Sequence, residues 1–495
     1  MGLKSTLSIP FAKYIVSKTK AWATKPIETQ EKVFHQLIKT AKNTKFGKDH
    51  DFKSIKNYED FKRRIPVRDY EEMKSYFEAV KSGQAHVLWP GKPLYLSKTS
   101  GTTSGAKYIP ITKESIPFHI KAARDSILHY IVASGNSDFV NGKMIFLQGS
   151  PELDESGPIP VGRLSGIVAH HVPNYLQKNR LPSFATNTIE DWEKKVDSVC
   201  AETMSQNMTL ISGIPPWVQM YFEKLLEKSG KANIKQLFPN FSLFIYGGVN
   251  YSPYRKTMEK LIGEKVDSIE LFPASEGFIA YQDSRDQEGM LLLLNSGIFY
   301  EFIPANEFHD ESSTRLSIGD VKLDVNYVLV LNTNAGLWGY NIGDTIRFVS
   351  LAPYRIVVSG RIKHYTSAFG EHVIAEEVEK AMSETSQQSD AEVAEFHLAP
   401  QLNPEGDKLP YHEWFIEFKQ EPKDLNYFAA LLNEAMLRQN SYYKDLIDGK
   451  MLQALRIRKV AKNGFSDFMK SQGKLGGQNK LPRLANDRKI ADQLL

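Results

Sequence analysis

The sequence of 495 residues predicts an α/β protein: a large N-terminal domain of α/β sheets with a β-barrel-like subdomain, and a smaller, mobile α+β C-terminal domain. Two observations lead to this prediction. Short, continuously apolar runs alternate with helical stretches over the first half of the chain, which is typical of buried parallel strands with helices on their faces. Closely spaced strand patterns follow from about residue 277, and a new pattern starts after residue 360.

The first elements are predicted to be helices. Residues 28–44 carry apolar side chains at helical spacing and predict a packing helix. Pro66 ends a short helix, because proline cannot continue one, and Asp69 is placed to cap the next. Strands are then predicted at residues 93–96 and 108–111, most simply as a hairpin.

Four apolar strands with helices between them predict the parallel sheet. The strands are predicted at residues 144–146, 210–212, 242–246 and 268–272, separated by helical stretches such as 187–206 and 216–229. The barrel-like antiparallel unit is predicted from strands at residues 289–294, 299–303, 326–331 and 345–349.

The C-terminal domain is predicted from a helix, a strand and a second helix. These elements span residues 374–382, about 414–418 and 424–438. We place the two domains at residues 1–360 and 361–495.

Composition and charge indicate a protein that acts on small molecules. The net charge is +4, from 62 basic and 58 acidic residues, which gives no overall case for nucleic acid or a membrane as partner. Cys200 is the only cysteine, which excludes an internal disulfide and a cysteine-rich zinc site. No segment approaches the ~20 apolar residues of a membrane helix, and the first residues lack the apolar part of a secretory signal. We therefore expect a cytoplasmic protein.

One segment is unusually rich in hydroxyl groups. Every position from Thr99 to Gly105 is serine, threonine or glycine, and Lys107 follows closely. Hydroxyl donors and unhindered amides can surround phosphate oxygens, and the lysine adds a positive charge. The segment does not match a standard nucleoside-triphosphatase P-loop, which needs a Gly-Lys pair followed directly by Ser or Thr, because Ala106 intervenes here. The alternative is a flexible surface linker.

Three further segments follow predicted strands, at the position where α/β sheets bind ligands. Paired glycines at Gly247 and Gly248 let the backbone approach a flat ring, or simply form a tight turn. Phe272, Ser275 and Glu276 suit a base, a phosphate oxygen and a magnesium ion; the alternative is a strand end with a helix-capping serine. Asp344 can accept both hydroxyls of a ribose, or serve as a turn residue.

Taken in order, these segments resemble the adenylate-forming superfamily, which comprises acyl-CoA synthetases, luciferases and peptide-synthetase adenylation domains. Residues 99–107 are similar, almost position for position, to its phosphate loop, with Ser104 for Gly and Ala106 for Pro. Over nearly the whole chain the sequence looks most like one branch, the auxin-responsive acyl acid amido synthetases and their bacterial relatives. The segments that carry this resemblance are 61–70 (Phe-x-x-x-Ile-Pro-Val-x-x-Tyr), 274–276, 340–344 and 476–484.

The resemblance implies ATP and Mg²⁺ as cofactors and a role for each matching residue. The residues expected to hold the phosphates of ATP are Thr99, Ser100, Gly101, Thr102, Thr103, Ser104 and Lys107. Those expected around adenosine are Gly247, Gly248 and Phe272 at adenine, and Asp344 with Arg361 at the ribose. Those expected at the reacting groups are Ser275 at the α-phosphate, Glu276 as the magnesium ligand and Lys480 as the catalytic lysine of the small domain.

The implied activity is that of a ligase that adenylates a small carboxylic acid and then transfers the acyl group to an amine, normally of an amino acid. Two alternatives stay open: a ligase that forms a thioester such as acyl-CoA, and a non-catalytic nucleotide-binding protein. The residues of the acyl pocket are expected from the segment 120–220.

Overall fold

The computed structural model describes residues 3–99, 107–172, 177–189, 192–248, 251–308, 310, 313–362, 365–366, 373–402, 404, 409–448, 452–473, 481–485 and 487–494. Contacts divide the chain into two compact units, residues 1–342 with 346–357, and residues 343–345 with 358–495. The predicted domain boundary, between residues 360 and 361, lies close to this division.

The parallel sheet predicted for the first half of the chain is present. Its order is β8-β7-β6-β3-β5, and each neighbouring pair is parallel. The strands are β3 (Lys143–Phe146), β5 (Arg180–Leu181), β6 (Met208–Ser212), β7 (Leu243–Gly247) and β8 (Asp267–Ala274). The four apolar runs that the sequence analysis singled out are thereby confirmed as strands. Because these strands are parallel, their carboxyl ends meet at one edge of the sheet.

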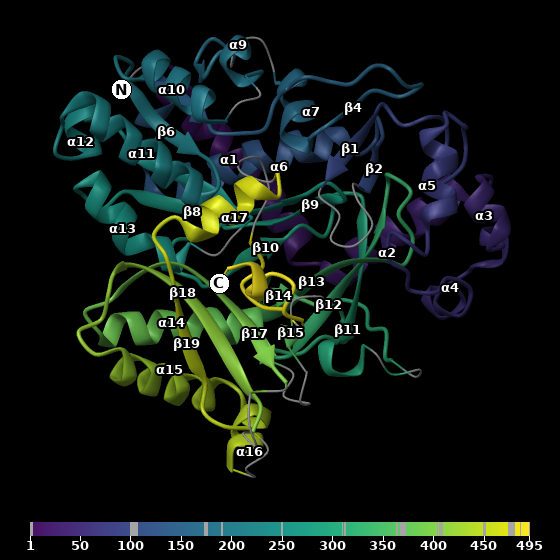
Figure 1. The fold of residues 1–495 in the computed structure, drawn as a ribbon. Coiled ribbons are helices and arrows are strands. Elements are labelled where there is room, and N and C mark those ends of the chain that lie inside the picture. The colour runs from purple at the N-terminus through teal and green to yellow at the C-terminus, as the bar shows by residue number, and fades with distance from the viewer. Residues whose placement is uncertain are drawn as a thin grey trace. The chain divides into compact units, whose positions relative to one another are not determined.

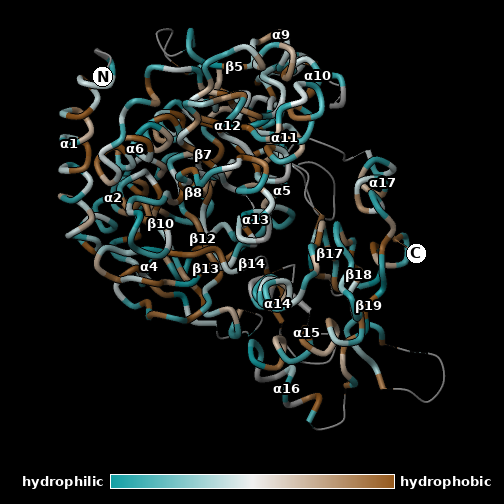
Figure 2. The backbone as a smooth tube through the Cα atoms, turned by 90° about the vertical axis from the view of Figure 1, so that its left-hand side faces the viewer, coloured by the Kyte–Doolittle hydropathy of each residue, from teal (hydrophilic) through white to brown (hydrophobic). Residues whose placement is uncertain are grey.

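Helices cover both faces of this parallel sheet (Figure 2). Leu210 of β6 packs among residues of α1 (Leu3–Ala23) and α6 (Ile116–Ser134), whereas the next residue, Ile211, packs with α10 (Trp192–Thr203), α11 (Pro215–Ser229) and α13 (Ser252–Ile262) on the opposite face. Successive side chains of a strand point to opposite faces, so burial on both sides explains the continuously apolar sequence. Each large apolar side chain buried here contributes about 1.5–3 kcal/mol.

The antiparallel strands belong to the same sheet. They are β9 (Gly277–Tyr281), β10 (Met290–Leu292), β11 (Ile298–Pro304), β12 (Asn326–Thr333), β13 (Tyr340–Leu351) and β14 (Tyr354–Arg361). The complete order is β11-β12-β13-β14-β10-β9-β8-β7-β6-β3-β5, so these strands extend the parallel sheet and do not form a separate barrel-like subdomain (Figure 1). The reason is the β8–β9 hairpin, whose tight turn reverses the chain and continues the pairing in antiparallel form.

Helices near the N-terminus pack on the antiparallel strands. They are α2 (Pro26–Ala41), α3 (Lys45–Asp49), α4 (Tyr58–Arg64) and α5 (Lys74–Lys81). The buried Gln30 of α2 donates from Nε2 to the carbonyl oxygens of Leu294 and Ile298, at 2.7 and 2.8 Å, and accepts from the amide of Tyr300 at 2.9 Å. These bonds fix α2, the helix predicted at 28–44, against the start of β11.

A small sheet and short helices complete the first unit. The sheet has the order β2-β1-β4 and consists of β1 (Tyr95–Thr99), β2 (Lys107–Ile111) and β4 (Val161–Gly162). The short helices are α7 (Leu164–His170), α9 (Phe184–Asn187) and α12 (Ile234–Leu237).

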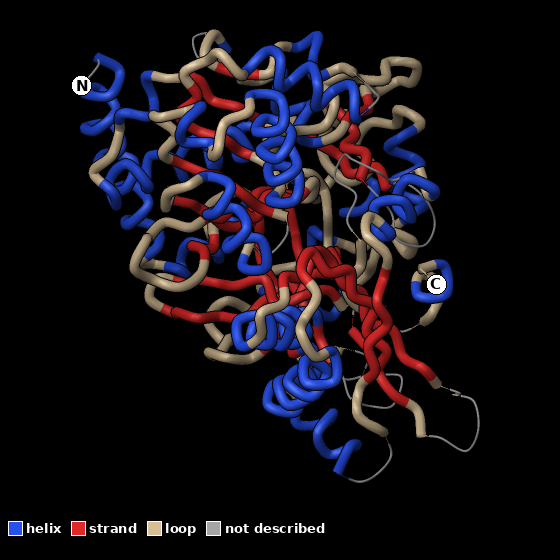
Figure 3. The backbone as a smooth tube through the Cα atoms, turned by 60° about the vertical axis from the view of Figure 1, so that its left-hand side comes forward, coloured by secondary structure: helices blue, strands red, loops and turns tan. Residues whose placement is uncertain are grey.

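The second unit is built around a three-stranded sheet with helices on both faces (Figures 2 and 3). The strands are β17 (Glu392–Gln401), β18 (Tyr411–Gln420) and β19 (Arg456–Val460), in that order. Trp414 packs with α14 (Ala375–Gln388) and α15 (Leu425–Gln439), whereas its neighbour Phe415 packs with Phe465 of α17 (Gly464–Ser471). The remaining elements are β15 (Tyr365–Thr366), β16 (Val373–Ile374) and α16 (Ser441–Asp448).

The helices in the described part of the chain include none that combines the length and apolar character needed to cross a membrane.

Candidate active site

The strands that flank the hydroxyl-rich segment pair with each other, as the sequence predicts. β1 pairs with β2 in antiparallel register, and Thr99 lies opposite Lys107 at the open end of the ladder. Ser100, Gly101, Thr102, Thr103 and Ser104, which the sequence analysis assigns to phosphate binding, lie outside the described residues.

The Ser-Glu segment forms the turn of a second hairpin. Ala274 pairs with Gly277, so Ser275 and Glu276 are the two turn residues between β8 and β9, and both are half-buried. The alternative of a helix-capping serine is thus excluded. A Cβ atom on Gly277 would lie 2.5 Å from Cδ1 of Ile298, so a larger residue would require the Ile298 side chain to move.

A hydrogen bond joins the two hairpins. The Oγ atom of Ser97, in β1, lies 2.9 Å from the Oγ atom of Ser275, although 178 positions separate them in the chain. The side chain of Ser97 is fully buried, so this hydroxyl has exchanged its water partner for Ser275. The contact fixes the strand that leads into the hydroxyl-rich segment beside the Ser-Glu turn.

Tyr70 supports the other strand of the first hairpin. Its hydroxyl oxygen accepts a hydrogen bond from the amide of Tyr108 at 3.0 Å, and the Lys107 ammonium lies 5.8 Å from the centre of its ring. Burial raises the pKa of Tyr70, so the hydroxyl stays neutral at physiological pH. The ring stacks on Phe77 of α5 with 4.6 Å between centroids. Tyr70 ends the matching segment 61–70, but nothing in the sequence pattern predicts this supporting role.

The glycine pair lies at the same edge of the sheet as the Ser-Glu turn. Gly247 ends β7, and a Cβ atom there would lie 2.4 Å from the carbonyl oxygen of Leu271 in β8. Gly248 follows with a φ of +83°, a conformation that favours glycine. The two strands therefore approach each other as closely as backbone allows. Phe272, by contrast, packs in the hydrophobic core and is only 9% exposed.

Asp344 lies within strand β13 and not in a turn. Its side chain is buried, at 7% exposure, and the preceding Gly343 accepts a hydrogen bond from the amide of Ile362 at 2.7 Å. Arg361 is the last residue of β14, and its side chain lies outside the described parts of the structure. Both Asp344 and Arg361 belong to the second unit.

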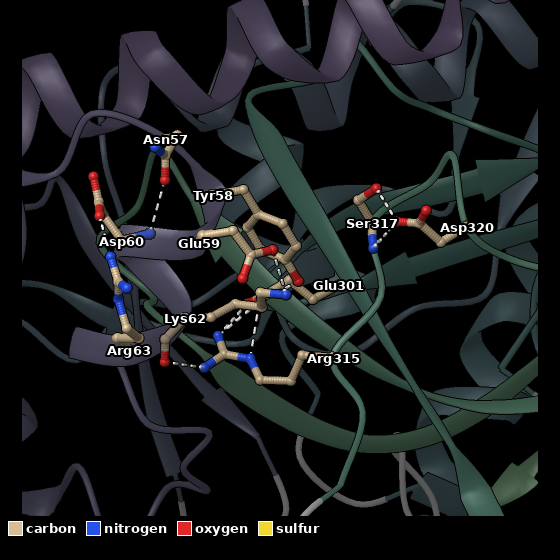
Figure 4. A network of polar contacts seen from close by, with 10 residues as sticks. All are labelled: Asn57, Tyr58, Glu59, Asp60, Lys62, Arg63, Glu301, Arg315, Ser317 and Asp320. Carbon is tan, nitrogen blue, oxygen red and sulfur yellow. Dashed lines mark hydrogen bonds and ion pairs between the residues drawn. The ribbon is translucent and has the colours of Figure 1, made fainter.

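A buried polar network holds the chain just before β13, and Figure 4 shows the part of it that Tyr58, Glu301 and Arg315 form. Glu301, which is fully buried, accepts from Arg315 at 2.8 and 2.9 Å, from the Tyr58 hydroxyl at 2.9 Å and from Asn332 at 2.9 Å. The amide oxygen of Asn332 in turn accepts from the backbone amide of Gly339 at 2.7 Å. The network thereby fixes the turn that leads into Tyr340 and the strand of Asp344.

Backbone pairing joins this turn to the segment that precedes Tyr70. The amide of Arg68 donates to the carbonyl oxygen of Gly339, and the amide of Asn341 donates to that of Arg68, each at 2.9 Å. A Cβ atom on Gly339 would lie 2.5 Å from the carbonyl oxygen of Pro66. The matching segments 61–70 and 340–344 are therefore neighbours in the fold.

A small cavity lies at the carboxyl ends of β3 and β5, within the region from which acyl-pocket residues are expected. It holds about 10 Å³, enough for one water molecule. The buried Lys195 donates to the carbonyl oxygens of Asn187 at 2.6 Å and of Gln148 at 3.2 Å, and burial lowers its pKa to about 8. The residues that line the cavity are Leu147, Gln148, Pro182, Asn187, Lys195, Val196, Val199, Trp217 and Tyr221.

Lys480, the expected catalytic lysine, lies outside the described residues. Cys200 is fully buried in the core of the first unit, where burial raises the pKa of its thiol to about 11. His171 lies 3.1 Å from the hydroxyl of Tyr95 in β1, and burial lowers its pKa.

Comparison with known proteins identifies the family. Models of the GH3 family match three stretches of the chain: the N-terminal domain at residues 16–185, the central domain at 291–361 and the C-terminal domain at 376–489. The chain belongs to the GH3 family. GH3 amido synthetases are ligases of the adenylate-forming type, and the expected resemblance to acyl acid amido synthetases is confirmed.

Characterised GH3 relatives are distant in sequence. Jasmonoyl-L-amino acid synthetase JAR4 of Nicotiana attenuata is 21% identical over 64% of this chain and 66% of its own length. Indole-3-acetic acid-amido synthetase GH3.3 of Arabidopsis thaliana is 20% identical over 94% of this chain and 90% of its own length.

Solved structures support the same GH3 fold. The GH3.15 acyl acid amido synthetase superposes with a TM-score of 0.80 at 15% identity and covers 97% of this chain and 95% of its own. The superposition confirms the coarse α/β architecture of a large N-terminal and a smaller C-terminal domain. A 2-hydroxyisobutyryl-CoA ligase in its postadenylation state superposes less closely, with a TM-score of 0.56 at 13% identity over 96% of this chain and 90% of its own.

Proposed function

We propose that this GH3 protein uses ATP to convert a small carboxylic acid into an acyl adenylate and then transfers the acyl group to the amine of an amino acid. The observation that carries the proposal is the 2.9 Å contact between Ser97 and Ser275, because it brings the start of the hydroxyl-rich segment to the Ser-Glu turn. The relatives whose names state an activity are amino acid synthetases or amido synthetases. The products are an amide, AMP and pyrophosphate.

The first step joins two anions. A carboxylate oxygen of the acid attacks the α-phosphorus of ATP, and the bond from that phosphorus to the bridging oxygen of pyrophosphate breaks. Lys107 and the hydroxyl-rich segment are assigned to the phosphates, and Ser275 is assigned to the α-phosphate. Fixed donors of this kind lower the barrier because they need no reorganisation as charge develops.

Mg²⁺ fits the residues at the Ser-Glu turn. Magnesium is usually held by one or two carboxylates together with phosphate oxygens and waters, and not by a cage of protein ligands. Glu276 supplies one half-buried carboxylate at the turn, and among the described residues no cluster of three metal-binding side chains is found. Glu276 would therefore hold the ion jointly with the phosphates, and bound Mg²⁺ would offset their negative charge.

The second step forms the amide. The amine nitrogen attacks the carbonyl carbon of the adenylate, the bond from carbon to the phosphate oxygen breaks, and the amine loses a proton. AMP leaves with one oxygen of the original acid. Gly247, Gly248 and Phe272 at adenine, and Asp344 with Arg361 at the ribose, are assigned by the family resemblance; Phe272 has little exposed surface to offer in the present structure.

Lys480 offers the most direct test of the first step. A panel containing indole-3-acetic acid, 2,4-DB, benzoate and hexanoate would be assayed for acid-dependent exchange of labelled pyrophosphate into ATP. We expect exchange with at least one acid in the wild type, and a loss of about 10²- to 10³-fold in Lys480→Ala, because a preorganised positive charge is removed. Lys489→Ala removes an exposed lysine from the same terminal segment and is expected to leave the rate unchanged. Unchanged exchange in Lys480→Ala would contradict the assignment of Lys480.

A further inference from the structure

Residues 483–485, which lie shortly after Lys480 in the sequence, pair with the edge strand of the second unit's sheet. β17 is the outer strand of its three-stranded sheet. The amide of Leu398, in β17, donates to the carbonyl oxygen of Arg483 at 2.8 Å, and the amide of Ala485 donates back to Leu398 at 3.0 Å. These two bonds make residues 483–485 a short parallel addition to the free edge of β17.

Side chains hold the same segment in place. Leu484 is fully buried in the core between the sheet and its helices. The guanidinium of Arg483 lies 3.2 Å from the carboxylate of Glu395 and 3.4 Å from that of Glu379, and stacks over the ring of Phe396 at 4.9 Å. Its side chain is only 11% exposed, so these contacts are largely shielded from water.

His397 forms a further contact with this segment, at Pro482, two residues after Lys480 in the sequence. Its Nδ1 lies 2.6 Å from the carbonyl oxygen of Pro482, and because a carbonyl only accepts, Nδ1 carries the proton and donates it. Proline has no amide hydrogen, so its carbonyl is the only backbone group of residue 482 that can form a hydrogen bond. The Nε2 atom of His397 has no partner among the described residues. The bond to Pro482 is therefore the ring's single hydrogen bond in this part of the structure.

The environment of His397 keeps this bond intact at physiological pH. The side chain is fully buried on the face of β17 that packs toward α17. Burial lowers the pKa of His397 to about 4, an effect that the bond to Pro482 partly opposes. The ring is therefore neutral at pH 7, with its one proton at Nδ1.

We propose that His397 is a positioning residue for Lys480: by donating to the carbonyl of Pro482, it fixes the backbone two residues after the catalytic lysine. The proposal rests on the proposed function, in which Lys480 stabilises the adenylation transition state. A displacement of about 1 Å at a reacting group can cost about 10²-fold in rate. His397 itself touches no substrate in this account.

The test compares three variants in the acid-dependent pyrophosphate exchange assay. His397→Ala removes the donor and is expected to lower kcat about 10- to 100-fold, with little change in KM for ATP. His397→Asn keeps a donor near the position of Nδ1 and is expected to recover most of the rate. His412→Ala is the matched control, because His412 is equally buried on the neighbouring strand β18 but stacks on Tyr443.

A double-mutant cycle shows whether His397 acts through Lys480. In a Lys480→Ala background, adding His397→Ala is expected to change the rate less than about twofold, because residues that act as one unit are not additive. A full additional loss in the double variant would overturn the proposal, and so would wild-type kcat in His397→Ala. Absence of pyrophosphate exchange in the wild type with every acid would contradict the proposed function itself. This outcome differs from a failure of the His397 proposal, in which the wild type is active and His397→Ala has the wild-type kcat.

Hydrogen–deuterium exchange provides a readout that does not need activity. In the full-length protein, the peptide that contains residues 481–485 is expected to exchange faster in His397→Ala than in the wild type, and at the wild-type rate in His412→Ala. Equal deuterium exchange of this peptide in the wild type and in His397→Ala would show that His397 does not fix the segment, whatever the pyrophosphate exchange assay shows.

Discussion

Ser97 is the residue on which the geometry of the candidate site depends most directly. Its hydroxyl is buried and lies 2.9 Å from that of Ser275, a contact that joins the two hairpins. Neither composition nor spacing predicts this contact, because residues 178 positions apart become neighbours only through the order of strands. Ser97 stands between Leu96 and Lys98 in β1, and this local sequence gives no indication of the contact.

The prediction for Ser97 concerns the efficiency with which the protein uses ATP. Ser97→Ala is expected to lower kcat/KM for ATP about 2- to 10-fold, since a typical hydrogen bond contributes about 0.5–1.5 kcal/mol. Adding Ser97→Ala to Ser275→Ala should have almost no further effect, because the bond is already lost. Thr112→Val is the control: it removes a buried hydroxyl just after β2 that bonds to Asn334. Fully additive losses at Ser97 and Ser275 would contradict a shared role.

At the scale of elements, the strands of the parallel sheet were predictable and their partners in the wider sheet were not. Continuous apolar runs such as residues 242–246 indicate burial on both faces, which only a covered parallel sheet provides. Strand periodicity fixes which face a side chain occupies but not which strand lies alongside. The sequence pattern therefore predicts a barrel-like unit for the antiparallel strands, whereas β9 continues directly from β8 in one sheet.

The polar network around Glu301 allows a test of how α4 and β11 are joined. Glu301→Ala leaves the Arg315 guanidinium, whose side chain is 10% exposed, without its carboxylate. Breaking one partner of a buried pair typically costs about 3–5 kcal/mol, so we expect a loss of that size in the free energy of unfolding. Glu59→Ala removes an exposed carboxylate that pairs with the half-buried Lys62 in the same helix and should cost at most about 1 kcal/mol. Urea unfolding of both variants measures the difference, and similar losses would show that the buried network has no special role.

At the scale of the whole molecule, two buried histidines make stability depend on pH in both units. Burial lowers the pKa of His119 and of His397 to about 4, below the ordinary value of 6.5. The unfolded chain therefore binds protons first as the pH falls from 6.5 toward 4, and each histidine destabilises the folded state over that range. Stability should be fully present above pH 6.5, with a loss of roughly 2 kcal/mol per histidine at pH 5.

Replacement of one histidine tests this pH dependence. In His119→Leu, the unfolding free energy of the first unit should fall less between pH 7 and pH 5 than it does in the wild type. This holds whether or not the substitution changes the unfolding free energy at pH 7. Urea titrations at several pH values, followed by a probe in each unit, give the two slopes separately. A wild-type slope of zero over this range would contradict the account of these two side chains.

The central claim is that the protein couples an acid to an amine through an acyl adenylate, and oxygen transfer tests it most directly. The protein would be incubated with ATP, an amino acid mixture and an acid whose carboxylate carries ¹⁸O, and the products analysed by mass spectrometry. The account predicts an amide and AMP that contains one ¹⁸O from the acid. Unlabelled AMP, or formation of ADP and phosphate in place of AMP, would contradict it.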